Sequence, residues 1–294
     1  MLFAGIIPAV LTPFDDEDRV DVDALRGNVA FLLDHGVHGL VATGTMGEAG
    51  QLSDDERRVV VEACVAEAAG RVPVVVGVSS AATAAATAHA AAAREAGAQG
   101  VMCLPPLLYA GEERELVAWF AAVGEAAGLP VMAYNNPHAS GIDLLPDAIA
   151  RIAGAVPAVR AIKECSGDPR RMTALLGATD LEVLVGADDC ALEGFAAGAT
   201  GWVSGVANVA PEPCCALLEQ VEAGRLPEAR ETYQRLLPLA RLDMTPQLVQ
   251  YFKGGLDAAG LHGGRVRPPR TALTEDQRVV LRDALAALGG PVVA

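Results

Sequence analysis

The residue with the most distinctive chemistry in this sequence is Lys163. Lysine and arginine together number 22, yet lysine occurs only at Lys163 and Lys253. Lys163 ends the short apolar run 159–163, which is typical of a buried strand. Because arginine stays protonated whereas a desolvated lysine can lose its proton and attack a carbonyl carbon, this position predicts a Schiff-base nucleophile. The competing interpretation is a lysine that extends to solvent or pairs with Glu164, but alternation along a strand sends Glu164 to the opposite face.

Tyr134 and the turn 44–48 are the next candidates. Tyr134 lies at the end of the apolar run that precedes the Lys163 run. If both runs are parallel strands, the two side chains can reach the same end of the sheet. A tyrosine hydroxyl near a Schiff base can shuttle protons; the alternative is a core tyrosine with a hydrogen-bonded hydroxyl. The glycine-rich turn Gly44-Thr45-Met46-Gly47-Glu48 offers successive backbone N–H groups to an anion, which suits the carboxylate of a 2-oxo acid.

Other polar clusters predict structural roles. Asp188 and Asp189 follow an apolar run and are interpreted as a helix cap in preference to a metal site. The five histidines form neither a metal-binding pair at helical spacing nor a catalytic triad. Lys253 falls in a predicted helix and is expected to be a solvated charge. We predict no metal and no organic cofactor, since a lysine-derived iminium is itself an electron sink.

A repeated pattern of strand, turn and helix must position these residues. The apolar runs alternate with amphipathic or alanine-rich stretches, and they are continuously apolar, as strands covered on both faces should be. Eight such units in one chain predict an α/β fold, a (β/α)8 TIM barrel, whose active site lies at the carboxyl ends of the strands. The expected strands are 6–11, 39–43, 72–78, 100–104, 130–135, 159–163, 181–186 and 201–204.

Helix boundaries are also marked in the sequence. Ser53 with Glu56 three residues later predicts a capping box, and the alanine-rich segment 81–93 predicts a helix whose small side chains pack close to the sheet. Further expected starts are Asp23, Asp143, Asp168 and Asp188, and expected stops are Gly36, Gly70, Gly97, Gly128, Gly177 and Gly198.

After the eighth strand the pattern changes to helices alone. The stretches 211–223, 226–243, 246–259 and 275–288 read as helices without an intervening strand. We therefore expect a barrel over residues 1–210 and a C-terminal helical extension over 211–294, packed on the barrel as one structural unit.

Composition limits the classes of function. The chain has 294 residues, of which 52% are hydrophobic, and this is enough for one large α/β domain. The net charge of −15 argues against nucleic-acid binding. Six cysteines without C-x-x-C spacing indicate neither a zinc site nor a redox pair. We find no signal-peptide pattern and no apolar run of membrane-spanning length, so we expect a cytoplasmic protein without membrane partners.

Four segments, taken in order, carry a resemblance to a known family: the GTMGE turn, Tyr134-Asn135-Asn136-Pro137, the strand end Ala161-Ile162-Lys163-Glu164 and Gly186-Ala187-Asp188-Asp189. The chain resembles the dihydrodipicolinate synthase / N-acetylneuraminate lyase family over essentially its whole length. The resemblance implies a barrel, usually a homotetramer, whose lysine forms a Schiff base with pyruvate or another small 2-oxo acid. It implies that Lys163, Tyr134 and Thr45 are catalytic, with Tyr134 as proton shuttle and Thr45 as its relay partner. It further implies substrate binding by Gly44, Met46, Gly47, Gly186 and Val203, with the backbone of Thr45 and Met46 holding the carboxylate.

Three departures from the family pattern bear on the substrate. Met46 stands where the family turn usually has a second hydroxyl residue. Ala139 stands where the synthase branch has an arginine for the second substrate's carboxylate. The synthase branch also supplies a tyrosine from a neighbouring subunit in the loop after strand four, and here that loop reads Pro105-Pro106-Leu107-Leu108-Tyr109, so this tyrosine is displaced or absent.

Several functions therefore stay open at this point. The leading hypothesis is a Schiff-base lyase on a small 2-oxo acid, by aldol cleavage or condensation, dehydration or deamination. Met46 and the Tyr-Asn-Asn-Pro segment also resemble the branch that deaminates 1-pyrroline-4-hydroxy-2-carboxylate in hydroxyproline breakdown. A true 4-hydroxy-tetrahydrodipicolinate synthase and a non-catalytic 2-oxo-acid sensor are the remaining alternatives.

Overall fold

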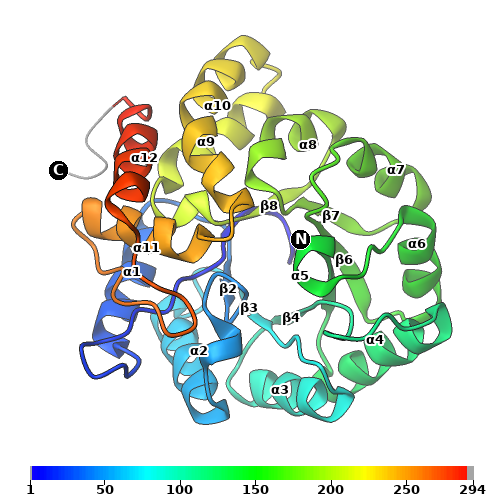
Figure 1. Cartoon of the computed structure of the whole chain (residues 1–294). Helices are drawn as coiled ribbons and strands as arrows, with labels where there is room; N and C mark the ends of the chain where they lie inside the picture. Colours follow the sequence, from blue (N-terminus) through cyan, green and yellow to red (C-terminus); the bar gives the residue numbers. More distant parts are fainter. Residues whose placement is uncertain (1, 290–294) are drawn as a thin grey trace.

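Eight parallel strands form one sheet that curves into a barrel in the computed structural model, which describes residues 2–289 (Figure 1). The strand order is β1-β8-β7-β6-β5-β4-β3-β2, and a parallel bridge between Ala9 and Val41 joins β1 to β2. The strands are β1 (Gly5–Pro8), β2 (Leu40–Ala42), β3 (Val74–Gly77), β4 (Gly100–Cys103), β5 (Val131–Asn135), β6 (Val159–Glu164), β7 (Glu182–Val185) and β8 (Gly201–Ser204). The predicted TIM barrel is confirmed, with strands that are mostly shorter than the apolar runs.

Helices surround the strands (Figure 1). Those that follow the strands are α1 (Val22–Asp34), α2 (Asp54–Ala68), α3 (Thr83–Glu95), α4 (Glu113–Ala127), α6 (Pro146–Ala155), α7 (Arg170–Ala178), α8 (Ala191–Ala197) and α9 (Pro211–Glu222). A short helix, α5 (Pro137–Ser140), lies beside the strand ends, and 3-10 turns occur at η1 (Ala49–Gln51), η2 (Asp188–Cys190), η3 (Val206–Asn208) and η4 (Arg241–Met244). In α3 the buried residues are all alanine, as the alanine-rich segment predicts. No described helix is both long and apolar enough to cross a membrane.

Local capping agrees with the sequence signals at two of the five predicted helix starts, Ser53 and Asp168. The capping box at Ser53 is present, with both reciprocal hydrogen bonds. The side chain of Asp168 accepts the backbone N–H of Arg170, at the start of α7. The expectation for α1 is wrong by two residues, because Asp21 and not Asp23 accepts the N–H of the first turn. A carboxylate stabilises a helix both at the N-cap, where Asp21 lies, and in the first turn, where Asp23 lies. Residue type alone therefore does not decide which of the two caps α1.

Two boundary predictions are wrong for reasons that lie elsewhere in the chain. Asp143 does not begin a helix; its carboxylate is bound by the guanidinium of Arg171, with Nη2 at 2.7 Å from Oδ2. Gly177 does not end a helix, because α7 continues through it to Ala178. Gly128 and Gly198 do end α4 and α8 in left-handed conformations, as expected.

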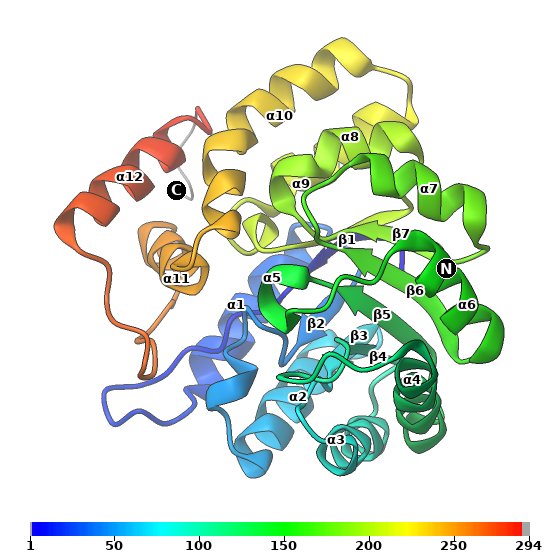
Figure 2. The same cartoon turned by 45° about the vertical axis from the view of Figure 1, so that its right-hand side comes forward.

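The C-terminal helices are α10 (Leu226–Ala240), α11 (Leu248–Ala258) and α12 (Glu275–Ala286), with α12 at the outer edge of the molecule (Figure 2). Helix α9 packs on β1 and on α8, which is the place of the eighth barrel helix. We therefore propose that the extension begins with α10, which moves the proposed boundary at 210/211 to residues 223–225. Residues 290–294 of the predicted extension lie outside the described residues.

Lys253 connects this extension to the barrel, and the expectation of a solvated charge is wrong. Its side chain is 2% exposed and its Nζ lies 2.7 Å from Oε1 of Glu48, which is fully buried. The ammonium also donates to the backbone carbonyl of Arg265. Since Glu48 closes the GTMGE turn, this buried ion pair joins α11 to the turn that follows β2. The partner is 205 positions away in sequence, and helical pattern gives no sign of it.

Candidate active site

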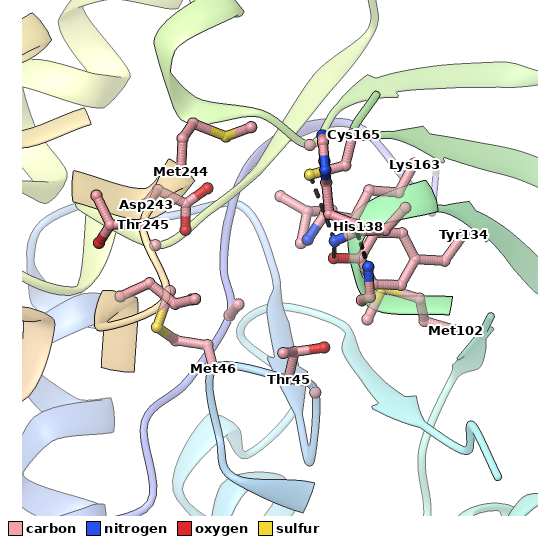
Figure 3. A pocket seen from close by; sticks show the side chains of 18 of the residues that line it. Thr45, Met46, Met102, Tyr134, His138, Lys163, Cys165, Asp243, Met244 and Thr245 are labelled. Carbon is pink, nitrogen blue, oxygen red and sulfur yellow. Dashed lines mark hydrogen bonds between the residues drawn. The ribbon is translucent and has the colours of Figure 1, made fainter. Parts of the chain in front are cut away.

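The central pair of the site is produced by strand register. β5 and β6 are parallel neighbours, and Tyr134 pairs directly with Lys163. The two side chains therefore leave the sheet side by side, and Lys163 Nζ lies 4.3 Å from the centre of the Tyr134 ring (Figure 3). Lys163 is only 7% exposed, so it does not extend to solvent. Glu164 points elsewhere, because its carboxylate accepts Nδ2 of Asn135 and the backbone N–H of Ser166.

Both side chains open into a cavity of about 560 Å³ at the carboxyl ends of the strands. The cavity brings together seven of the eight residues predicted to bind or transform substrate. They are Gly44, Thr45, Met46, Tyr134, Lys163, Gly186 and Val203. The exception is Gly47, whose carbonyl accepts the hydroxyl of Thr12 behind the turn. A Cβ at Gly47 would lie 2.9 Å from the carbonyl oxygen of Val10, so this glycine lets the turn approach the end of β1.

Gly186 is required by the position of the lysine. A Cβ at Gly186 would lie 2.8 Å from Cγ of Lys163 and 2.9 Å from Cβ of Cys165. Real Cβ atoms do not approach so closely, so any larger residue would move the lysine stem. Gly186 is therefore a residue that shapes the site, and its backbone N–H donates to the carbonyl of Glu164 at 2.7 Å.

The turn after β2 presents unused donors to the cavity. Within residues 2–289, the backbone N–H groups of Thr45 and Met46 donate no hydrogen bond. Thr43 and Glu48 have left-handed backbones, with φ of 51° and 55°, which curl the turn. The Met46 side chain is buried, and its terminal methyl lies against Gly205. The geometry is that of a small anion cradle at the mouth of the barrel.

The Tyr134 hydroxyl has a partner that the sequence did not identify. It accepts a hydrogen bond from Nδ2 of Asn136 at 2.9 Å. Thr45 lines the same cavity but forms no hydrogen bond with Tyr134 here, so the proton relay stays a prediction. Burial raises the pKa of Tyr134 to about 12, although the charge of Lys163 lowers it. The phenol is therefore protonated at neutral pH and able to donate.

The ionisation of Lys163 differs from the expectation of a depressed pKa. Burial does lower its pKa, but the groups around it, namely Tyr134, Cys165 and the carboxylates of Asp243 and Asp188, raise it further than burial lowers it. The thiol of Cys165 has a pKa raised to about 12 by burial and is neutral at pH 7, as the phenol is. Asp243 and Asp188 are therefore the two acidic groups near Lys163 whose ionised forms favour the ammonium. The free enzyme must lose a proton from Lys163 before the amine can attack.

Asp188 holds the end of β8 and does not cap a helix. It is fully buried, and its carboxylate accepts Nε1 of Trp202 at 2.7 Å and the backbone N–H of Val206 at 2.7 Å. The backbone N–H of Gly205 donates to it as well, at 3.0 Å. Burial and the neighbouring Asp243 raise the pKa of Asp188 well above its usual range. The cap interpretation is wrong because the partners come from the next strand.

Sequence reasoning missed the wall that the extension contributes. Asp243 and Met244 of η4 and the following Thr245 lie across the cavity from Lys163 and Tyr134 (Figure 3), and Leu248 at the start of α11 also lines the cavity. The short helix α5 adds His138 and Ala139 at the mouth. The helical pattern of the C-terminal extension does not indicate which residues face the barrel. Nothing in the sequence therefore indicated that Asp243 lines the cavity. Among residues 2–289, no group of three or more His, Cys, Asp or Glu side chains is placed to hold a metal ion.

A parallel barrel with a buried lysine beside a tyrosine at the strand ends defines the class I lyase barrels, and comparison with known proteins agrees. The model of the dihydrodipicolinate synthetase family matches residues 2–288. The 4-hydroxy-tetrahydrodipicolinate synthases of Methanothrix thermoacetophila and Methanopyrus kandleri are 36% and 35% identical to this chain, over 98% and 97% of it and 97% and 96% of their own lengths.

Solved structures give the same result. The dihydrodipicolinate synthase of Thermotoga maritima superposes with a TM-score of 0.94 at 28% identity, covering 98% of this chain and 99% of that one. A prophage protein of the dihydrodipicolinic acid synthase family from E. coli K12, solved in complex with pyruvate, gives a TM-score of 0.93 at 27% identity over 98% and 99% of the two chains. The chain belongs to the dihydrodipicolinate synthetase family, and it is a class I lyase.

Proposed function

We propose that the cavity binds a small 2-oxo acid and that Lys163 forms a Schiff base with its carbonyl carbon. The observation that carries this proposal is the 4.3 Å approach of Lys163 Nζ to the Tyr134 ring inside a cavity. Lys163 is also the one lysine or arginine among the lining residues, all of which are described. An enclosed amine beside a protonated phenol has what carbinolamine formation and dehydration require.

The reaction begins when Lys163 loses its proton and its Nζ attacks the 2-oxo carbon. The C–N bond forms, the carbonyl oxygen becomes a hydroxyl, and loss of water leaves the iminium. Tyr134, protonated at neutral pH, gives the proton that the departing oxygen needs and recovers it in the next step. The iminium then withdraws electrons from the adjacent carbon, which allows a bond at C3 to break or form.

The carboxylate of the substrate fits the turn after β2. Thr45 and Met46 line the cavity, and their backbone N–H groups donate no hydrogen bond within the described residues, which suits an anion. Gly44 lines the same cavity, and a Cβ built on it would meet Cε of Met102 at 3.6 Å, an ordinary contact distance. Thr45 carries a hydroxyl near this point, and we propose it as the relay partner of Tyr134. Gly186 and Val203 would line the opposite side of the bound acid.

The residue set suits aldol cleavage or condensation, dehydration and deamination, since each proceeds from the same iminium. The branch that deaminates 1-pyrroline-4-hydroxy-2-carboxylate is the more specific candidate, on the basis of Met46 and Asn136. Intact Lys163 and Tyr134 in one cavity argue against a sensor without turnover.

A 4-hydroxy-tetrahydrodipicolinate synthase is the second candidate, and the names of the relatives at 36% and 35% identity favour it. Against it stands Ala139, which lines the cavity at the position where the synthase branch is expected to have an arginine. An assay with pyruvate and aspartate semialdehyde separates the two candidates.

We also propose a cytoplasmic homo-oligomer, with a tetramer as the family resemblance implies. Leu108 is 95% exposed and Tyr109 is 54% exposed on the loop after β4, which supports burial of this loop against another copy. All six cysteines are free, as is usual for proteins of a reducing compartment. The proposed partners are the substrate and further copies of this chain.

Reduction of the adduct with borohydride tests the central proposal. Incubation with pyruvate and borohydride should add the mass of one reduced pyruvyl group to the peptide that contains Lys163. The chain offers a clean assignment, because Lys253 is the other lysine and is buried against Glu48. Lys163→Arg should abolish labelling, and the peptide that contains Lys253 should stay unlabelled in both proteins. Labelling elsewhere, or a labelled Lys163→Arg protein, would contradict the proposal.

A further inference from the structure

The wall of the cavity opposite the lysine carries a carboxylate. Asp243 belongs to η4 and reaches the cavity from the extension, on the other side from Lys163 and Tyr134 (Figure 3). Its Oδ1 would lie 3.1 Å from a Cβ built on Gly205, so the absence of a side chain at Gly205 leaves room for it. Among residues 2–289, no lysine or arginine forms an ion pair with Asp243. The carboxylate lines the cavity and therefore has acceptor capacity for a molecule that binds there.

The remaining polar groups of this wall do not compete for the same role. The hydroxyl of Thr245 donates to the carbonyl of Leu242 at 2.8 Å, so its proton is already used. Met244 and Leu248 are apolar, and Ala139 has no functional group. Asp243 is therefore the acidic side chain on the wall of the cavity opposite Lys163.

The charge of this residue has consequences for the substrate. Burial raises the pKa of Asp243 to about 6, while the charge of Lys163 lowers it. The group is therefore mostly ionised at neutral pH. An ionised carboxylate accepts hydrogen bonds and donates none, and it repels a second carboxylate in a cavity that lacks an arginine. A hydroxyl or a protonated nitrogen would satisfy it.

We propose that Asp243 determines substrate specificity, and that the substrate carries a hydroxyl or a nitrogen donor at its distal end instead of a second carboxylate. This inference rests on the proposed function, since it assumes that the 2-oxo end of the substrate is held by Lys163. On this proposal, Asp243 of the extension recognises the distal end of the substrate, and Lys163 of the barrel reacts with its carbonyl group.

Three five-carbon acids that differ only at the end of the chain test it. They are 2-oxopentanoate with a methyl group, 5-hydroxy-2-oxopentanoate with a hydroxyl and 2-oxoglutarate with a carboxylate. Each is trapped with borohydride over a range of concentrations, and the half-saturating concentration is divided by that for pyruvate measured on the same protein. This ratio removes any general effect of a variant on Lys163.

In the native protein the hydroxy acid should be trapped at a concentration roughly 10- to 100-fold lower than the methyl acid, the range for a hydrogen bond to a charged group. 2-Oxoglutarate should be the poorest of the three. Asp243→Leu should remove the preference for the hydroxyl, and Asp243→Arg should make 2-oxoglutarate the best ligand. The control, Asp283→Asn on the exposed face of α12, removes one negative charge far from the cavity and should leave all ratios unchanged.

The outcomes separate this inference from the proposed function. If pyruvate is not trapped on Lys163 in the native protein, the proposed function fails. If pyruvate is trapped but the hydroxy and methyl acids do not differ, or 2-oxoglutarate is preferred, the assignment of Asp243 is wrong. Retention of the hydroxyl preference in Asp243→Leu would overturn it as well.

Discussion

The buried ion pair between Lys253 and Glu48 predicts a large and specific loss of stability on substitution. Lys253→Met keeps most of the apolar stem but leaves the Glu48 carboxylate buried without its cation. Breaking a buried pair in this way typically costs about 3–5 kcal/mol. Two groups remain near the carboxylate, since Arg270 Nη1 lies 3.6 Å from its Oε2 and the backbone N–H of Arg267 donates to it at 3.1 Å. We therefore expect the lower end of the range, about 3 kcal/mol.

Urea unfolding at a fixed protein concentration measures this loss. With a slope of about 3 kcal/mol per M, the midpoint of Lys253→Met should fall by about 1 M without a change in slope. The double variant Lys253→Met/Glu48→Gln should recover part of the loss, because it removes the orphaned charge. Arg278→Met is the matched control, since its 3.4 Å pair with Glu275 is exposed and is worth at most about 1 kcal/mol. If Lys253→Met behaves like this control, or if the double variant is less stable than Lys253→Met, the reasoning fails.

Four further predictions concern turnover or the rate of borohydride trapping. Tyr134→Phe should lower turnover by roughly 10²–10⁴, with a smaller effect for Thr45→Val, and an unchanged turnover with only a raised Michaelis constant would make Tyr134 a binding residue. Gly186→Ala should slow borohydride trapping of pyruvate, because the new methyl meets the Lys163 stem at 2.8 Å; equal trapping rates would refute this. Because the pKa of Lys163 is raised in the free enzyme, its reactive amine becomes more abundant as pH rises, so the trapping rate should increase about tenfold per pH unit between pH 7 and 9, and a flat profile would contradict it. Condensation of pyruvate with aspartate semialdehyde, coupled to the downstream reductase, should be absent or very slow, and turnover near the typical enzyme value of about 10 s⁻¹ would return the protein to the synthase branch.

The barrel and its central pair were predictable because their signals are local. Continuous apolar runs separated by turns specify strands covered on both faces, and the carboxyl ends of such strands must meet at one mouth. Lys163 and Tyr134 end adjacent runs, so their proximity follows from parallel order alone, and the structure pairs them in register. Gly186 was predictable as a member of the site but not as the residue that fixes the lysine stem, since that depends on a contact between strands.

The contacts that join distant segments of the chain were not predictable, for a physical reason. Asp188 was assigned to a cap and Lys253 to solvent because each was judged by its own segment. Their partners, Trp202 and Glu48, come from other elements. A buried charge is tolerated only where such partners converge, and convergence of distant segments leaves no periodic pattern in sequence.

The extension therefore has two functions that the barrel alone cannot supply. Through Lys253 it fixes Glu48, and so the turn whose free N–H groups face the cavity. Through Asp243 it places a carboxylate opposite the lysine. On the proposed function, the first contact would support binding of the part that all 2-oxo acids share, and the second would concern the part in which they differ. Substitutions in η4 should consequently change which acid is accepted while Lys163 remains the site of the adduct, whereas loss of the Lys253 contact should weaken the binding of all acids alike.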